Sequence, residues 1–252
     1  MTRSRSVAAE MLDEMPADHP GARRSRRDLQ RIHRAMGTCS IILREWRRLR
    51  FTGGGANPLR VLEIGAGDGR LMLSVARAMG AQQRPVALNL LDRLDLVDEK
   101  TVNHYAELGW TVTPQIVDIR DWARDGDDGA TSAANAQRWD LIVANLFLHH
   151  FDDGFLRVLL RAVGTRASAF LAVEPRRSAL ALAGSRLVGA LGANAVTRND
   201  AVLSVRAGFL GSELTHMWPT PHADWTLGEY PAGLFSHCFC AMRGSRDDAD
   251  RL

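Results

Sequence analysis

The chain is short of lysine and cysteine, and it has no long run of apolar residues. Its 32 Lys and Arg residues include a single lysine, Lys100, which indicates a coding bias rather than a functional feature. The longest apolar stretches have the length of a strand, so we predict no transmembrane helix. Residues 1–20 contain four acidic residues and no apolar core, which argues against a secretion signal.

The three cysteines are Cys39, Cys238 and Cys240. The last two alternate along a strand-like run, so their thiols should share one face of that strand. This spacing does not match a zinc knuckle, and no nearby cysteine or histidine pair completes four ligands. We therefore predict reduced thiols, no metal site and a cytoplasmic location.

The net charge of +3 is unevenly distributed. Residues 21–50 hold ten arginines against Asp28 and Glu45, so the rest of the chain is net acidic. A basic helix can bind nucleic acid or an anionic membrane. A solvated face on a terminal helix explains the pattern more simply. The hydrophobic fraction of 46% is ordinary for a globular protein, and the length favours one domain.

The order of the expected elements predicts an α/β fold. Strand-like and helix-like segments alternate from Leu59 onward, which is typical of a doubly wound parallel sheet. The expected strands are 59–64, 86–91, 111–117, 139–145, 168–174, 225–230 and 233–243. Helical patterns cover 70–80, 98–109, 154–165 and 178–191. We predict a disordered tail over 1–24, a helical cap over 25–52 that Gly37 can divide, and the sheet domain over 53–245.

The most informative segment is 59–70, where a buried strand runs into a glycine-rich turn. Glu63 precedes Gly65, Gly67 and Gly69, and a helical pattern follows at once. In α/β proteins, such glycines let the backbone approach a nucleoside-bearing ligand. The dinucleotide fingerprint requires a third glycine where this chain has Arg70, which disfavours NAD-type cofactors.

This Gly-x-Gly-x-Gly turn resembles the first motif of class I S-adenosylmethionine (SAM) dependent methyltransferases. The ends of the next strands resemble further motifs of that family: Asp92 for the ribose, Asp118 and Ile119 for the adenine, and Asn145-Leu146 at the methyl-transfer site. The resemblance covers residues 59–243 and implies a Rossmann-like seven-stranded sheet whose last strand is antiparallel. The cofactor-binding residues that it implies are Glu63, Gly65, Ala66, Gly67, Gly69, Asp92, Arg93, Asp118, Ile119, Asn145 and Leu146.

His149 and His150 are the predicted catalytic residues, because they follow the fourth strand at the edge where open sheets bind ligands. A histidine there can act as general base or orient an oxygen nucleophile. Packing or helix capping is the simpler role for both. Weaker candidates for the acceptor pocket are Arg176, Arg177, His33, Met36, His216, Trp218 and His222.

We therefore predict a SAM-dependent methyltransferase that acts on a small molecule, with oxygen of an aromatic or polyketide-like acceptor favoured. C-methylation of a quinone precursor is the alternative within the same class. RNA or protein methylation is disfavoured, since Leu146 and Phe147 stand where base methyltransferases carry two prolines. A SAM-binding regulator without turnover is also compatible with these residues. The sequence does not fix the oligomeric state, and a homodimer is possible.

Overall fold

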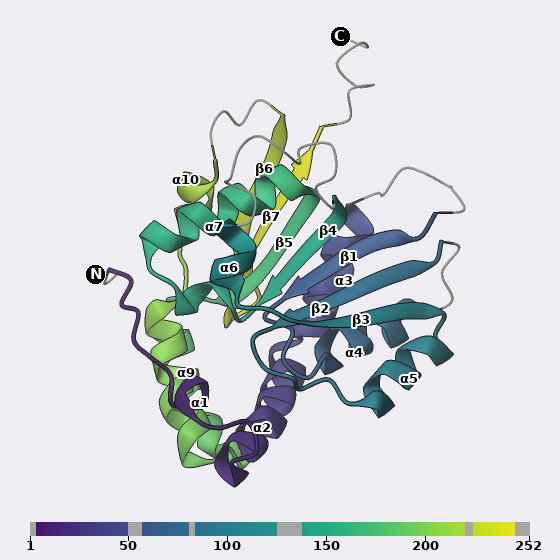
Figure 1. Cartoon of the computed structure of the whole chain (residues 1–252). Helices are drawn as coiled ribbons and strands as arrows, with labels where there is room; N and C mark the ends of the chain where they lie inside the picture. The colour runs from purple at the N-terminus through teal and green to yellow at the C-terminus, as the bar shows by residue number, and fades with distance from the viewer. Residues whose placement is uncertain (1–3, 50–56, 81–83, 125–137, 220–223, 245–252) are drawn as a thin grey trace.

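The computed structural model describes residues 4–49, 57–80, 84–124, 138–219 and 224–244. In these residues seven strands form a single sheet of order β3-β2-β1-β4-β5-β7-β6 (Figure 1). The strands are β1 Leu59–Ile64, β2 Val86–Asp92, β3 Trp110–Ile116, β4 Trp139–Asn145, β5 Ala167–Pro175, β6 Trp225–Ala232 and β7 Ser236–Arg243. Strands β1 to β5 pair in parallel, and β7 is antiparallel to both of its neighbours. The predicted doubly wound sheet with an antiparallel last strand is confirmed.

The helices lie on both faces of the sheet and at the edge formed by its carboxyl ends (Figure 1). The helices are α1 Met11–Glu14, α2 Pro20–Met36, α3 Thr38–Arg48, α4 Arg70–Met79, α5 Glu99–Glu107, α6 Ile119–Arg124, α7 Asp153–Arg166, α8 Ala179–Leu187, α9 Ala195–Ala207 and α10 Glu213–Met217, with short 3-10 turns η1 Leu148–His150 and η2 Val188–Leu191.

Two apolar cores fill the space between the sheet and its helices. Alternate strand residues point to opposite faces, so Val61 belongs to one core and Leu62 to the other. Helices α3, α4 and α5 contribute to the first core, and α6, α7 and α10 to the second. Residues of β1 and β4 are buried on both faces, which explains their almost continuous apolar sequences.

The cap is built from segments that only partly match the predicted range 25–52. Gly37 does divide the segment, with φ of 68° at the C-terminus of α2. The second half, α3, packs on the sheet instead, because Ile42 and Trp46 are buried in the first core. Helix α9, which the sequence pattern did not reveal, lies beside α1 and α2 in its place (Figure 1).

Residues 4–24 differ from the disordered tail that the sequence predicts. The Arg5 guanidinium pairs with Asp153 at the start of α7, with a nitrogen–oxygen distance of 2.7 Å. Glu10 is buried, and the Asp200 carboxylate accepts hydrogen bonds from the Met11 and Leu12 amides at 2.9 and 3.0 Å. Polar contacts therefore fix a segment that has no apolar period.

The cysteines carry free thiols, and the sulfur atoms of Cys238 and Cys240 lie 3.8 Å apart on one face of β7, as predicted. Among the described residues, no helix combines the length and the apolar character that crossing a membrane requires.

Phe170 on β5 tests the second core. Its side chain is fully buried and stacks on Trp218 with ring centres 5.9 Å apart. Replacing Phe170 by alanine should lower the free energy of unfolding by about 3–5 kcal/mol, because a large cavity remains. The exposed Leu187 is the control, and Leu187→Ala should change stability by less than about 0.5 kcal/mol. Equal effects of both variants in denaturant titrations would contradict this packing.

Candidate active site

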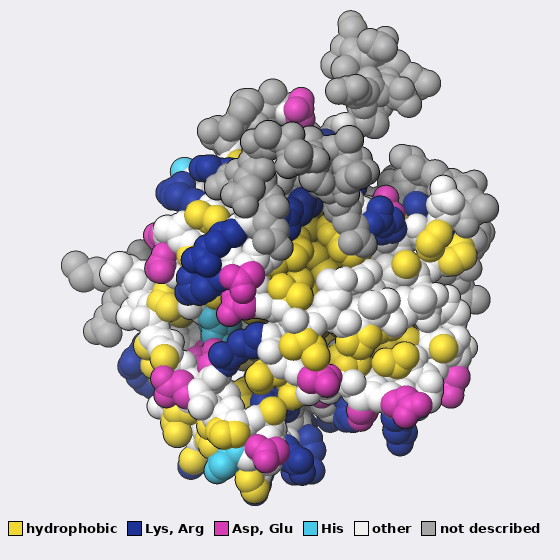
Figure 2. Space-filling view, viewed as in Figure 1, with side chains coloured by type: hydrophobic (Ala, Val, Ile, Leu, Met, Phe, Trp, Pro, Cys, Tyr) yellow, Lys and Arg dark blue, Asp and Glu magenta, His cyan; other side chains and the backbone are white. Residues whose placement is uncertain are grey.

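A cavity of about 590 Å³ lies at the carboxyl ends of the parallel strands. The sheet order reverses between β1 and β4, and this is the position where open α/β sheets bind their ligands. The sheet supplies one wall, and α1, α2 and the segment before α1 supply the other. Figure 2 shows histidine, acidic and basic side chains next to one another between the sheet and these helices.

The glycine turn between β1 and α4 forms the floor of the cavity. Gly65, Gly67 and Gly69 all have positive φ, between 56° and 70°. A side chain at Gly65 would place its Cβ 2.2 Å from a ring carbon of Phe147. The Tyr105 hydroxyl donates to the Gly69 carbonyl at 2.6 Å and holds the end of the turn. Positive φ disfavours a side chain at all three positions, and a Cβ would also clash with Phe147 at Gly65 and with Leu90 at Gly69.

Glu63 at the end of β1 is buried, and its Oε2 atom has no hydrogen-bond partner among the described residues. Burial, together with the nearby carboxylates of Asp68 and Asp92, raises the pKa of Glu63 well above its usual value. Three acidic groups that converge on one end of a cavity favour a cationic ligand there. A cationic ligand group would also give the unpaired Oε2 a partner.

Asp92 and Asp118 follow β2 and β3 at the same edge and line the cavity. The Gly67 amide donates to Asp92 Oδ2 at 2.8 Å, which ties β2 to the glycine turn. The Arg120 amide donates to Asp118 Oδ1 at 2.7 Å at the start of α6. Both carboxylates keep further lone pairs that a ligand hydroxyl or amino group can use.

Asn145 and Leu146 end β4 in the middle of the cavity wall. Leu146 has φ of 48°, a strained conformation for a side-chain-bearing residue, and such strain often occurs at functional sites. Asn145 Nδ2 donates to His33 Nε2 at 3.3 Å, and its buried Oδ1 has no partner in the described residues. Burial lowers the pKa of His33 to about 4, so this histidine is neutral and can accept.

Glu174 at the end of β5 organises the neighbouring strand end. Its side chain is completely buried, and Oε1 accepts hydrogen bonds from the Phe147 and Leu148 amides at 3.0 and 2.9 Å. Its Oε2 lies 2.8 Å from Nδ1 of His149 and accepts a hydrogen bond from this N–H. One carboxylate therefore fixes both the turn after β4 and the orientation of the His149 ring.

The two predicted catalytic histidines differ in their surroundings. His149 is buried between Glu174 and Glu10, whose Oε1 lies 3.3 Å from His149 Nε2. Burial alone would lower the pKa of His149, but the two carboxylates outweigh it and raise the pKa to about 9. His150 is partly exposed, and its Nδ1 lies 3.0 Å from Asp13 Oδ2. His149 is therefore protonated on both ring nitrogens at neutral pH and carries a positive charge. This makes it a poor base.

The cap also reaches the side of the cavity that the glycine turn forms. Gln30 of α2 donates to Asp68 Oδ2 at 2.7 Å. The Arg93 guanidinium donates to the Asp13 carbonyl and lies 3.7 Å from its carboxylate. Residues far apart in the sequence thus close one cavity.

The structure brings together nearly all of the residues predicted from the sequence. Gly69 does not line the cavity. Those that line it are Glu63, Gly65, Ala66, Gly67, Asp92, Arg93, Asp118, Ile119, Asn145, Leu146, His149 and His150. The sequence reasoning missed Glu10 and Asp13, because single acids in a polar segment carry no pattern. The binding and catalytic roles of the residues that were named from the sequence remain predictions.

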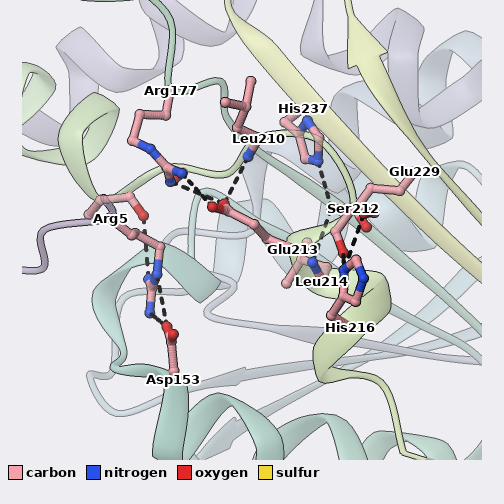
Figure 3. Close-up of polar contacts among 12 residues, drawn as sticks. Arg5, Asp153, Arg177, Leu210, Ser212, Glu213, Leu214, His216, Glu229 and His237 are labelled. Carbon is pink, nitrogen blue, oxygen red and sulfur yellow. Dashed lines mark hydrogen bonds and ion pairs between the residues drawn. The ribbon is translucent and has the colours of Figure 1, made fainter. Parts of the chain in front are cut away.

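Arg177, one of the weaker candidates for the acceptor pocket, does not line the cavity. Its guanidinium pairs with Glu213 and donates to the Gly208 carbonyl at 2.5 Å (Figure 3). Nearby, His237 pairs with Glu229 at 2.8 Å, and Glu229 accepts from the Thr215 amide, which holds α10 against β6 (Figure 3). Trp218 is buried in the second core, and His222 lies outside the described residues. These contacts are structural.

Comparison with known proteins supports the fold. No protein-family model and no curated protein matches the chain. A plantazolicin methyltransferase solved with a substrate analogue and SAH aligns with TM-score 0.59 and 10% identity, covering 93% of each chain. Magnesium protoporphyrin IX methyltransferase from Synechocystis, with bound SAH, aligns with TM-score 0.51 and 14% identity over 90% of this chain and 96% of that one.

An O-methyltransferase family protein from Burkholderia thailandensis aligns with TM-score 0.53 and 16% identity over 90% of this chain. The aligned region spans 61% of that protein, less than two thirds of its length. At these identities the comparisons show a shared methyltransferase-type fold.

Gly65 provides a test of the turn. Gly65→Ala should destabilise the protein by about 1–3 kcal/mol more than Gly67→Ala, because only the first Cβ meets Phe147. Gly67 is the matched control, since its φ is also positive and no atom lies within 4 Å of the added Cβ. Denaturant titration of the two variants measures the difference. Equal losses would show that Phe147 does not lie against the turn.

His33 provides a test of pH dependence. Its pKa of about 4 in the folded protein lies below the ordinary value of 6.5, so the unfolded chain binds the proton first. The neutral His33 makes its full contribution to the free energy of unfolding above pH 6.5. This contribution is lost as the pH falls towards 4, by at most about 1.4 kcal/mol per pH unit. In His33→Gln this contribution should be missing. Parallel stability curves for the two proteins over this range would contradict a buried neutral His33.

Proposed function

We propose that this protein is a SAM-dependent methyltransferase acting on a small molecule. The observation that carries the proposal is the convergence of the glycine turn with Glu63, Asp92 and Asp118 on one cavity at the switch point of the sheet. The fold shared with three methyltransferase structures supports it, and two of these contain SAH.

The residues around the glycine turn fit this cofactor. The unpaired Oε2 of Glu63 and the acids beside it suit the ammonium and sulfonium charges of the amino-acid end. We assign the two ribose hydroxyls to Asp92 at the end of β2, and the adenine edge to Asp118 with the Ile119 amide, because all three residues line the cavity. Bound SAM supplies an activated methyl group on a sulfonium leaving group.

The acceptor end of the cavity is formed by Asn145, Leu146, His149 and His150, with the cap opposite. These residues exclude water and hold the nucleophile in line, which contributes much of the rate of a methyl transfer. The unpaired Oδ1 of Asn145 can accept a hydrogen bond from either ligand. The protonated His149 orients or stabilises an acceptor oxygen better than it removes a proton from it.

Oxygen of an aromatic or polyketide-like compound is the acceptor that we favour, with carbon of a quinone precursor as the alternative. The cavity size of about 590 Å³ suits a cofactor with a small acceptor better than a folded macromolecule. Arginines of the basic segment 21–50 are already paired with acids, such as Arg31 with Asp28 and Arg48 with Glu45, which weakens a role in RNA binding. Free thiols suit a cytoplasmic location.

Calorimetric titration with SAM and with its demethylated product SAH tests the cofactor. Both should bind the wild type with micromolar Kd, and Asp92→Asn should weaken binding about tenfold or more, because hydrogen bonds to a charged group are lost. Asparagine keeps one oxygen for the Gly67 amide but loses the one that accepts from the Leu94 amide at 3.0 Å, so circular dichroism must check that the variant is folded. Asp121→Asn on the exposed face of α6 is the control and should bind as the wild type does.

The absence of binding by folded wild-type protein would refute the proposed cofactor. With binding established, labelled SAM and a panel of phenolic and quinone acceptors should yield a methylated product. Binding without transfer to any acceptor of the panel would favour a SAM-dependent regulator instead.

A further inference from the structure

We propose that Glu10, His149 and His150 form a binding site for a divalent transition-metal ion at the acceptor end of the cavity. One ligand atom from each residue lies within 4.8 Å of the others. Two imidazoles and one carboxylate are a donor set that suits iron, cobalt, nickel and zinc. All three residues line the cavity, so a bound ion would be accessible to a small molecule.

The geometry of His149 favours an ion most directly. Its Nδ1–H donates to Glu174, which directs Nε2 away from Glu174, and Nε2 becomes the ligand atom when the ion displaces the second proton of the ring. Nε2 is buried and makes no hydrogen bond within the described residues, although Glu10 Oε1 is only 3.3 Å away. Two ligands of a tetrahedral ion with bonds of roughly 2.0–2.1 Å are separated by about 3.3–3.4 Å. The observed separation therefore matches two ligands of one ion.

His150 repeats the same arrangement. Its Nδ1 pairs with Asp13 at 3.0 Å, which leaves Nε2 as its ligand atom. Histidines that bind metals in proteins generally have their other nitrogen held by a carboxylate or carbonyl, which fixes the ring and its tautomer. Here Glu174 and Asp13 hold one histidine each. The rings of His149 and His150 lie with centres 4.3 Å apart, so the two residues can share an ion after small movements.

The carboxylate ligand is held in place by the cap. The Ser204 hydroxyl of α9 donates to Glu10 Oε1, and Asp200 accepts from the two amides that follow Glu10. An ion at this site would thus link the segment before α1 to the turn after β4. A coordination position left open towards the cavity would take an oxygen of the acceptor, so the histidines would act on the acceptor through the ion.

Titration of the cofactor-free protein with cobalt(II) tests this site, because bound cobalt has a visible absorption spectrum that reports its ligands. We expect one equivalent per chain with micromolar Kd. Glu10→Gln and His150→Ala should each weaken binding at least tenfold through loss of a ligand, and Asp13→Asn roughly tenfold through loss of the partner of His150. Both ligand variants leave the His149–Glu174 pair intact, so the fold should be retained, as circular dichroism can check.

His104→Ala on α5 is the matched control, since it also removes one histidine but lies outside the site. It should bind cobalt like the wild type. No binding by folded wild type, or binding that Glu10→Gln and His150→Ala leave unchanged, would overturn the proposal. The two histidines and their acidic partners would then be ion pairs without a metal. The inference does not rest on methyl transfer, because the titration contains no SAM, and SAM binding can succeed or fail independently of it.

Discussion

The arrangement of this cavity depends on one buried carboxylate. Glu174 is completely inaccessible to solvent, and its charge is tolerated because backbone amides and an imidazole donate to it. Through these bonds, β5 dictates the path of the chain after β4. Leu146 keeps its strained backbone, Phe147 lies against Gly65, and His149 points towards the cap. The cofactor end and the acceptor end of the cavity are therefore set by the same side chain.

The fold and the cofactor half of the site could be predicted because their signals are local. A buried parallel strand is an uninterrupted apolar run, and the residue that ends it lies at the ligand-binding edge by topology alone. Glu63, Asp92, Asp118 and Asn145 could each be identified from the strand that precedes them. All four line the cavity of the structure. The local pattern also predicted that Gly37 divides the N-terminal helical segment into two helices.

The cap and the acceptor half could not be predicted in the same way, because polar contacts between distant segments hold them. Helix α9 faces α2 with Thr197, whose hydroxyl lies 2.7 Å from that of Ser25, and the Asn194 amide donates to Asp28. A helix whose buried face contains Thr197 and Asp200 shows no apolar stripe, so its period is hidden. Glu10 contacts His149 only because the chain fold brings the segment before α1 next to η1, and no local pattern shows this contact.

The pairing of Asp13 with Arg93 has a consequence for how quickly ligands reach the cavity. About half of each side chain is exposed, so dissolved ions screen this pair, whereas they have little access to the buried pair of Glu10 and His149. A cofactor that passes between α1 and the end of β2 must separate the exposed pair first. Its association rate by that route should therefore rise with ionic strength, whereas ligands whose charge is opposite to that of their site associate more slowly in salt.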